Sequence, residues 1–107
     1  MGKLVRDKIP EMIRASGRTP HVRTLRTAEY RTALLDKLRE EVAELIAAAT
    51  SDAVIEEAAD VLEVLTAIAV GHGGTLDNIV GVARSKRAER GGFDMRFWLD
   101  GVDAASP

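Results

Sequence analysis

KLREEVAELIAAATSDAVIEEAADVLEVL, residues 37–65, is the stretch that decides the fold of this chain. Apolar residues recur there and just beside it at the i, i+3, i+4 spacing of a buried helical face: Leu34, Leu38, Val42, Leu45 and Ile46 in a first run, then Val54, Ile55, Ala58, Val61, Leu62, Leu65 and Ile68 in a second. Thr50-Ser51-Asp52 separates the runs, and Ser51 or Asp52 is suited to N-cap the second helix. Helices joined by so short a loop return antiparallel, so the sequence predicts a helical hairpin.

Each arm of this hairpin carries a group of carboxylates, EEVAE at Glu40–Glu44 and EEAAD at Glu56–Asp60. Within each group, acids three residues apart share one helix face. The groups lie about eight residues from the turn on either side, and at roughly 1.5 Å of rise per residue both stand about 12 Å from it. On a helical wheel, Glu41 and Glu57 fall beside the apolar seam. The sequence therefore predicts that acids of the two arms face each other at the same height.

Unpaired carboxylates beside an apolar seam repel each other and lose hydration, and a hard divalent cation relieves both effects. Oxygen ligands suit Mg²⁺ or Mn²⁺, and the chain contains no cysteine that could supply a thiolate. The alternative is that these are solvated, glutamate-rich helix faces, which are common. Two acidic groups at matching height count against that alternative without removing it.

Three segments in this order resemble the MazG-like, all-α nucleotide pyrophosphohydrolases, which are related to phosphoribosyl-ATP pyrophosphohydrolase. They are KLVRDKIP at Lys3–Pro10, the EExxE and ExxD acids of the hairpin, and KxxxRGGF at Lys86–Phe93. The first and last segments look like a small bacterial and phage branch of that family. The similarity extends from Lys3 to about Leu99.

The resemblance implies an enzyme that splits a nucleoside triphosphate into nucleoside monophosphate and pyrophosphate with Mg²⁺, in nucleotide house-cleaning. By the family motif the metal ligands would be Glu41, Glu44, Glu57 and Asp60. Glu40 or Glu44 would orient or deprotonate the attacking water, acting as the catalytic group. Lys86 and Arg90 would bind phosphate oxygens, although cations near a helix C-terminus also simply complement its dipole.

Two other functions stay open. One is the phosphoribosyl-ATP pyrophosphohydrolase step of histidine biosynthesis, which the segments at Lys3–Pro10 and Lys86–Phe93 disfavour. The other is a non-catalytic helical oligomerisation module whose acidic faces are merely solvated.

Length and composition bound the class of protein. The 107 residues predict one domain, 1–107, and 46% hydrophobic with 30% charged residues is ordinary for a globular protein. A net charge of −2 argues against binding a nucleic-acid polymer. Neither a signal peptide nor a run long enough to span a membrane is recognisable, so a cytoplasmic protein is expected.

The remaining segments complete a mainly α prediction. Expected helices run from Ile9 to about Ser16, Thr27 to Ala49, Asp52 to about Val70 and Leu76 to Arg90; short strands are expected at Val22–Arg26 and Phe93–Leu99, and a disordered tail at Asp103–Pro107. The helix from Asp52 is apolar around most of its girth, which requires burial on several sides. We therefore expect a homo-oligomer, dimer or tetramer, in which the hairpin and the last helix form a four-helix-type bundle.

Overall fold

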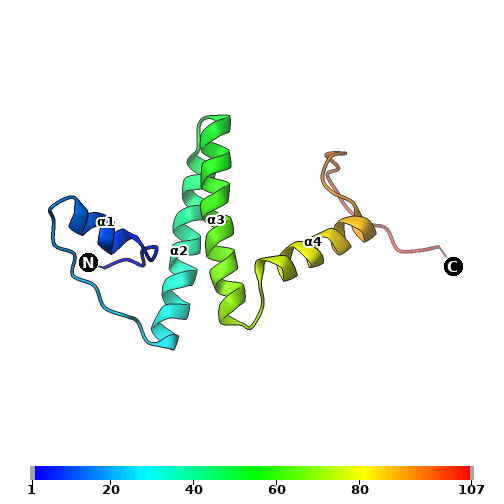
Figure 1. The fold of residues 1–107 in the computed structure, drawn as a ribbon. Coiled ribbons are helices and arrows are strands. Elements are labelled where there is room, and N and C mark those ends of the chain that lie inside the picture. Colours follow the sequence, from blue (N-terminus) through cyan, green and yellow to red (C-terminus); the bar gives the residue numbers. More distant parts are fainter. Residues whose placement is uncertain (1, 107) are drawn as a thin grey trace. The chain divides into compact units, whose positions relative to one another are not determined.

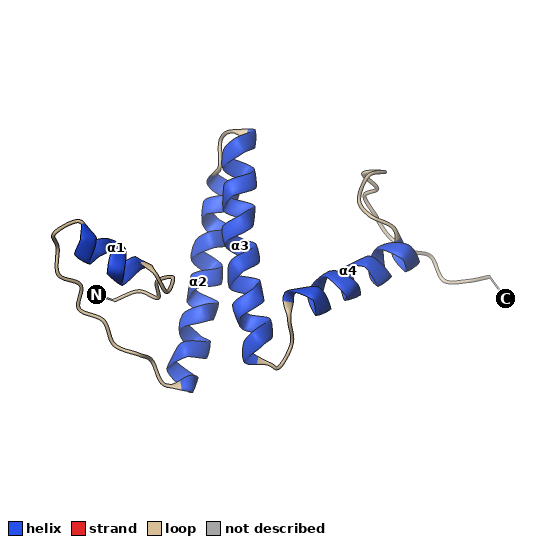
Figure 2. Cartoon of the chain, in the orientation of Figure 1, coloured by secondary structure: helices blue, strands red, loops and turns tan. Residues whose placement is uncertain are grey.

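The computed structural model describes residues 2–106, and its regular elements are helices (Figure 1). They are α1 (Ile9–Ala15), α2 (Thr27–Ala47), α3 (Ser51–Gly71) and α4 (Leu76–Arg90). The described residues contain no strand (Figure 2). The mainly α class is therefore confirmed, and α4 has the bounds that the sequence predicted.

Helices α2 and α3 form the predicted antiparallel hairpin, side by side and joined by residues 48–50 (Figure 1). Each helix has 21 residues, so at 1.5 Å per residue each is about 30 Å long. Leu34 of α2 and Val64 of α3 are buried between the arms. The hairpin is thus the part of the chain that holds the acidic groups in fixed register.

The start of α3 differs by one residue from the sequence prediction. Thr50, with φ −125° and ψ 158°, is the N-cap, and its Oγ1 accepts a hydrogen bond from the Ala53 N–H at 3.1 Å. Ser51 is already the first helical residue. The prediction of Ser51 or Asp52 was wrong because the extended backbone that a cap requires lies at Thr50.

A similar shift occurs at the start of α2, where Arg26 rather than Thr27 precedes the helix as N-cap. The Glu29 carboxylate accepts a hydrogen bond from the Arg26 backbone N–H at 3.3 Å, so it satisfies one amide at this end. Shifts this small leave the acids of α2 and α3 at matching heights.

The prediction of two short strands was wrong. Residues 22–26 are irregular, and residues 93–95 form a bend and turn in which the Arg96 N–H donates to the Phe93 carbonyl at 3.1 Å. Phe97 and Trp98 are exposed. Aromatic content favoured a strand, but two isolated strands are marginal without a third strand or a helix to pack against.

By its internal contacts the chain divides into two compact units, Met1–Leu76 and Asp77–Pro107. The first holds α1, α2 and α3, and the second holds nearly all of α4 with the segment that follows it. A single domain over 1–107 stays a prediction. Residues 103–106 of the expected tail have no regular structure, and Pro107 lies outside the described residues.

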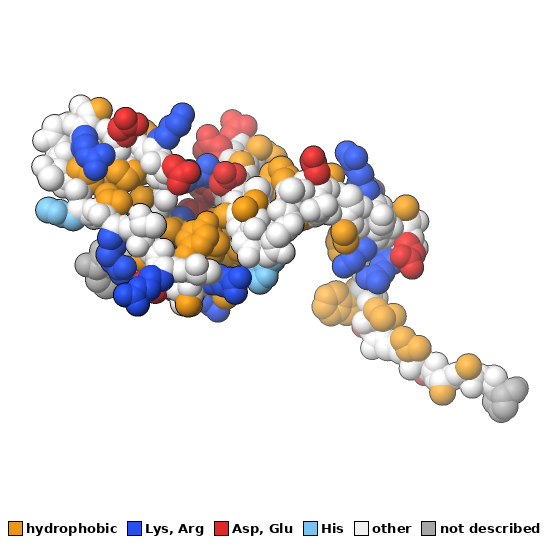
Figure 3. Space-filling model, turned by 60° about the horizontal axis from the view of Figure 1, so that its bottom comes forward, with side chains coloured by type: hydrophobic (Ala, Val, Ile, Leu, Met, Phe, Trp, Pro, Cys, Tyr) orange, Lys and Arg blue, Asp and Glu red, His pale blue; other side chains and the backbone are white. Residues whose placement is uncertain are grey.

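Large apolar side chains reach the surface of the chain (Figure 3). On the hairpin, Ile46 is 80% exposed, Ile55 70% and Val70 62%.

Within residues 2–106, no helix combines the length and the hydropathy that crossing a bilayer requires.

Candidate metal and phosphate site

Three carboxylates from the two arms of the hairpin converge on one point. One oxygen each of Glu41 and Glu44 from α2 and of Glu57 from α3 lie within 4.8 Å of one another. Glu41 and Glu44 share a face because they are three residues apart, and the antiparallel return of α3 brings Glu57 to the same height. The structure thus brings together three of the four acids that the family motif marks as ligands.

Two of these carboxylates each have one enclosed oxygen atom without a hydrogen-bond partner among the described residues. Glu41 is 7% exposed and Glu57 is half-buried. The Oε2 atoms of both residues are buried, and neither finds a hydrogen-bond partner among the described residues. A buried, unsatisfied carboxylate oxygen is unfavourable, so these two atoms point to a ligand that supplies positive charge.

The donor set fits a divalent cation of the hard class. It consists of carboxylate oxygens from two rigid helices, with exposed Glu44 on the side open to water. Oxygen-only ligands and room for water are what Mg²⁺ and Mn²⁺ require. If such an ion binds here, Glu41, Glu44 and Glu57 are the residues that would hold it.

Lys37 of α2 forms an ion pair with one of these acids. Its Nζ lies 3.3 Å from Glu41 Oε1 and 3.4 Å from Glu40 Oε1. Burial acts to lower the pKa of Lys37, but its interactions with Glu41 and Glu40 outweigh burial and raise that pKa. The sequence analysis did not identify Lys37, although its i, i+3 and i, i+4 spacing to Glu40 and Glu41 predicts ion pairs on one helix face.

The pKa of Glu41 is raised, whereas an ion pair by itself lowers the pKa of an acid. Burial raises the pKa of the Glu41 carboxyl, the Lys37 ammonium opposes this rise, and the adjacent Glu44 carboxylate adds to it. The folded protein therefore disfavours the charge on Glu41 despite the ion pair with Lys37. A second cation at this point would remove that penalty.

Asp60, the fourth acid of the motif, lies one turn along α3 from Glu57, and the three-acid group does not include it. Its Oδ1 instead lies 2.6 Å from Nη2 of Arg6, in the segment before α1. The two side chains are 40% and 58% exposed, and ion pairs this open contribute about 0.2–1 kcal/mol. The role of Asp60 as a ligand stays a prediction.

The other predicted functional residues lie outside the three-acid group. Glu40 is exposed and pairs with Lys37. Lys86 and Arg90 are exposed residues of α4, and Lys86 borders a shallow depression of the second unit with Ile79 and Val82. Their catalytic and phosphate-binding roles stay predictions.

A pocket of about 210 Å³ lies at the open end of the hairpin, away from the turn. Its lining is mainly apolar and includes Tyr30, Leu34 and Ile68, together with the polar residues Arg31 and His72. None of the four motif acids lines it. This pocket is a separate feature from the acidic group.

The fold and the acids together define an α-helical protein that carries a group of carboxylates across a hairpin. The family model described as phosphoribosyl-ATP pyrophosphohydrolase matches residues 5–86, which include α1, α2, α3 and most of α4. The chain belongs to the phosphoribosyl-ATP pyrophosphohydrolase family. The resemblance drawn from the sequence motifs is therefore confirmed.

A protein of Mycolicibacterium smegmatis (strain ATCC 700084 / mc(2)155), described as an uncharacterized protein, is 66% identical to this chain over 56 residues. The match covers 52% of this chain and 57% of that relative, so it spans little more than half of either protein. No solved structure matches the chain.

Proposed function

We propose that this protein is a Mg²⁺-dependent nucleoside triphosphate pyrophosphohydrolase, which releases pyrophosphate and a nucleoside monophosphate. One observation supports this proposal above the others. The buried Oε2 atoms of Glu41 and Glu57, one from each arm of the hairpin, have no hydrogen-bond partner among the described residues. A solvated acidic face would not enclose charged atoms in this way, so the observation disfavours a purely structural hairpin.

Glu41, Glu44, Glu57 and Asp60 are the proposed ligands. Mg²⁺ bound by such carboxylates polarises phosphoryl oxygens and offsets their negative charge. The protein's own residues would then position the substrate and move one proton. Exposed Glu44, or Glu40 one turn before it, would accept the proton from water as the water oxygen bonds to phosphorus. The bond to the oxygen bridging the α- and β-phosphates breaks, and pyrophosphate leaves. Lys86 and Arg90 would stabilise the charge that develops.

Membership of the family supports a pyrophosphohydrolase, and two classes of nucleotide are candidate substrates. A house-cleaning nucleotide substrate is the first candidate, and phosphoribosyl-ATP is the alternative, with which the family description is compatible. Turnover of phosphoribosyl-ATP beside a panel of canonical and modified nucleoside triphosphates separates the two.

Pyrophosphate release tests the activity directly. We expect the wild-type protein to release pyrophosphate from at least one nucleotide of the panel with Mg²⁺ and to release none with a chelator. Glu57→Gln keeps the side-chain volume and removes a ligand charge, so it should lower kcat by about 100-fold or more, as loss of an electrostatic catalytic group does.

Glu63→Gln, an exposed neighbour on α3, is the matched control and should keep wild-type activity. Circular dichroism verifies that both variants fold. Equal activity of the two variants, or release that persists in chelator, would contradict the proposal.

A further inference from the structure

The Arg6–Asp60 ion pair joins the segment before α1, to which no function has been assigned so far, to one of the proposed metal ligands. Arg6 belongs to the irregular segment before α1, and Asp60 is 54 positions further on, in the middle of α3. Within residues 2–106, no other ion pair links the segment before α1 to the hairpin. Arg6 is therefore the charged side chain through which this segment contacts an acid of the hairpin.

The geometry of the pair leaves most of the guanidinium available. The contact joins Nη2 of Arg6 to Oδ1 of Asp60 at 2.6 Å, and the Arg6 side chain is 58% exposed. A guanidinium has five N–H donors in a planar fork, and that fork matches two oxygens of a phosphate group. A one-point contact thus leaves Arg6 with donors free to bind an anion beside Asp60.

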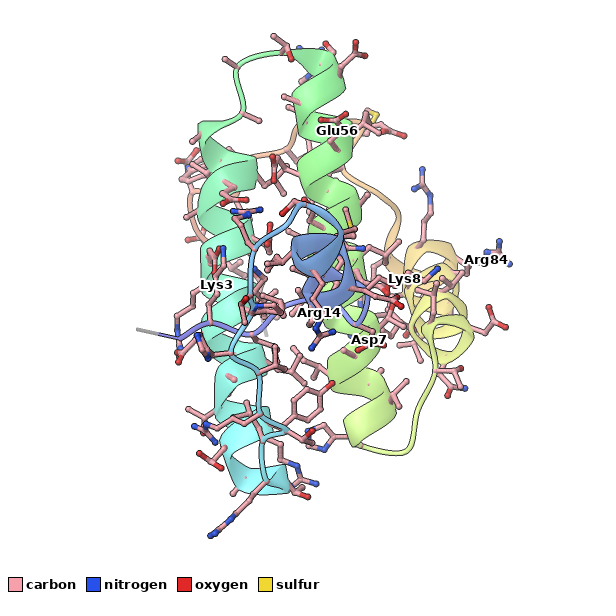
Figure 4. The ribbon with its side chains drawn as sticks, turned by 60° about the vertical axis from the view of Figure 1, so that its left-hand side comes forward. Lys3, Asp7, Lys8, Arg14, Glu56 and Arg84 are labelled. Carbon is pink, nitrogen blue, oxygen red and sulfur yellow. The ribbon has the colours of Figure 1, made fainter. Side chains whose placement is uncertain are left out.

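The surrounding charge also favours an anion here. Residues 3–8 carry three cations, Lys3, Arg6 and Lys8, and one acid, Asp7. Figure 4 shows Lys3, Asp7 and Lys8 on the amino-terminal segment, which passes in front of the hairpin, with Glu56 further up α3 toward the turn. The segment therefore presents net positive charge on the side of the hairpin that bears Asp60.

From these observations we propose that Arg6 is a polyphosphate-binding residue, held by Asp60 while the site is free and released when a divalent cation takes the Asp60 carboxylate. The proposal rests on the proposed function, because it assumes that the acids hold a cation and that a polyphosphate binds to it. It assigns a role to the amino-terminal segment, which would close one edge of the site. An exposed ion pair is weak enough to exchange in this way.

Two binding measurements on the whole chain test the proposal. The first is the Kd for Mg²⁺ alone, and the second is the Kd of the Mg²⁺-saturated protein for inorganic pyrophosphate, both by isothermal titration calorimetry. Arg6→Gln removes the competitor for Asp60, so we expect Mg²⁺ to bind roughly two- to five-fold more tightly. The same variant loses the phosphate contact, so pyrophosphate should bind about tenfold or more weakly.

Lys8→Gln is the matched control, because it removes one positive charge from the same segment without touching Asp60. Its Kd for Mg²⁺ should stay within about twofold of wild type, and its Kd for pyrophosphate should rise about threefold at most, well short of Arg6→Gln. Arg6→Lys keeps the charge but loses the fork, so its pyrophosphate affinity should fall between wild type and Arg6→Gln. Circular dichroism confirms that the variants fold.

Equal pyrophosphate affinity in Arg6→Gln and Lys8→Gln overturns the proposal, and so does an unchanged Mg²⁺ affinity in Arg6→Gln. Either result leaves the proposed hydrolysis intact if the wild-type protein still binds Mg²⁺ and pyrophosphate. Wild-type protein that binds neither overturns the proposed function and this inference together.

Discussion

Glu41 is the residue in which packing and charge conflict most directly. Its side chain is buried, one oxygen pairs with Lys37, and the other has no partner among the described residues. Glu44 and Glu57 add negative charge from the same helix and from the facing one. Such a group lowers the stability of the folded protein when no metal is bound, and a bound cation restores that stability.

Replacing Glu41 with glutamine tests this conflict. Glu41→Gln should melt about 2–5 °C above wild type at pH 7 in chelator, because a neutral amide relieves the repulsion from Glu44 and Glu57. Added Mg²⁺ should raise the Tm of wild type and leave that of the variant nearly unchanged. Thermal melts monitored by circular dichroism, with and without chelator, measure both effects. A variant less stable than wild type in chelator at pH 7 would contradict this account.

The difference in Tm between Glu41→Gln and wild type should depend on pH, and the direction of the Glu41 pKa shift sets the sign of that dependence. The pKa of Glu41 in the folded protein lies above its ordinary value of 4.5, chiefly because the carboxyl is buried. The folded state therefore binds the proton more tightly than the unfolded state does. The tighter proton binding stabilises the folded state fully below pH 4.5, and this stabilisation is lost as pH rises through the pKa of Glu41 in the folded protein. The advantage of Glu41→Gln should accordingly shrink as the melts are taken from pH 7 to pH 5.

At the scale of elements, the hairpin was predictable because all its signals are local. Periodic apolar residues, a short polar connection and i, i+3 acids fix two antiparallel helices and the height of Glu41, Glu44 and Glu57. The ends of the helices were less certain, since Thr50, Ser51 and Asp52 are all good N-caps by residue type. Only the backbone conformation distinguishes them.

The cap of α3 gives a sharp test of the hairpin geometry. Thr50→Ala removes the hydroxyl that accepts from the Ala53 N–H, and it should lower the free energy of unfolding by about 1 kcal/mol. Ser51→Ala, one residue later, should change it by less than about 0.5 kcal/mol, because that residue is already helical. Urea unfolding of both variants provides the comparison. The opposite order would place the start of α3 at Asp52, as the sequence alone suggested.

At the scale of the whole molecule, long-range relations were the part that sequence reasoning could not reach. No periodicity relates Arg6 to Asp60, and their contact depends on how the segment before α1 returns over α3. The expected strands failed for a related reason. Strand propensity at Phe93–Leu99 is local, whereas a strand exists only through a partner elsewhere in the chain.

The exposed apolar residues of the hairpin support the expectation of a homo-oligomer, which stays a prediction. Ile46 and Ile55 are 80% and 70% exposed, and a second copy of the chain would cover such residues in a bundle. We expect sedimentation velocity to give a dimer or tetramer for wild type. Ile46→Glu combined with Ile55→Glu should shift the protein to monomer, because carboxylates are costly to bury in the interface.

Met12→Glu changes an exposed apolar residue of α1 and serves as the control, with no expected effect on assembly. A wild-type protein that sediments as a monomer at high micromolar concentration would contradict the prediction.

The connection of residues 48–50 between α2 and α3 also bears on how the site arises during folding. Closing this tight turn brings Glu41, Glu44 and Glu57 into proximity without waiting for distant segments of the polypeptide. Topologies dominated by such near-neighbour pairings fold within microseconds to milliseconds. A nascent chain that has emerged only as far as Gly71 would already contain all three of these carboxylates. Cation binding and closure of the hairpin would then stabilise each other early in folding.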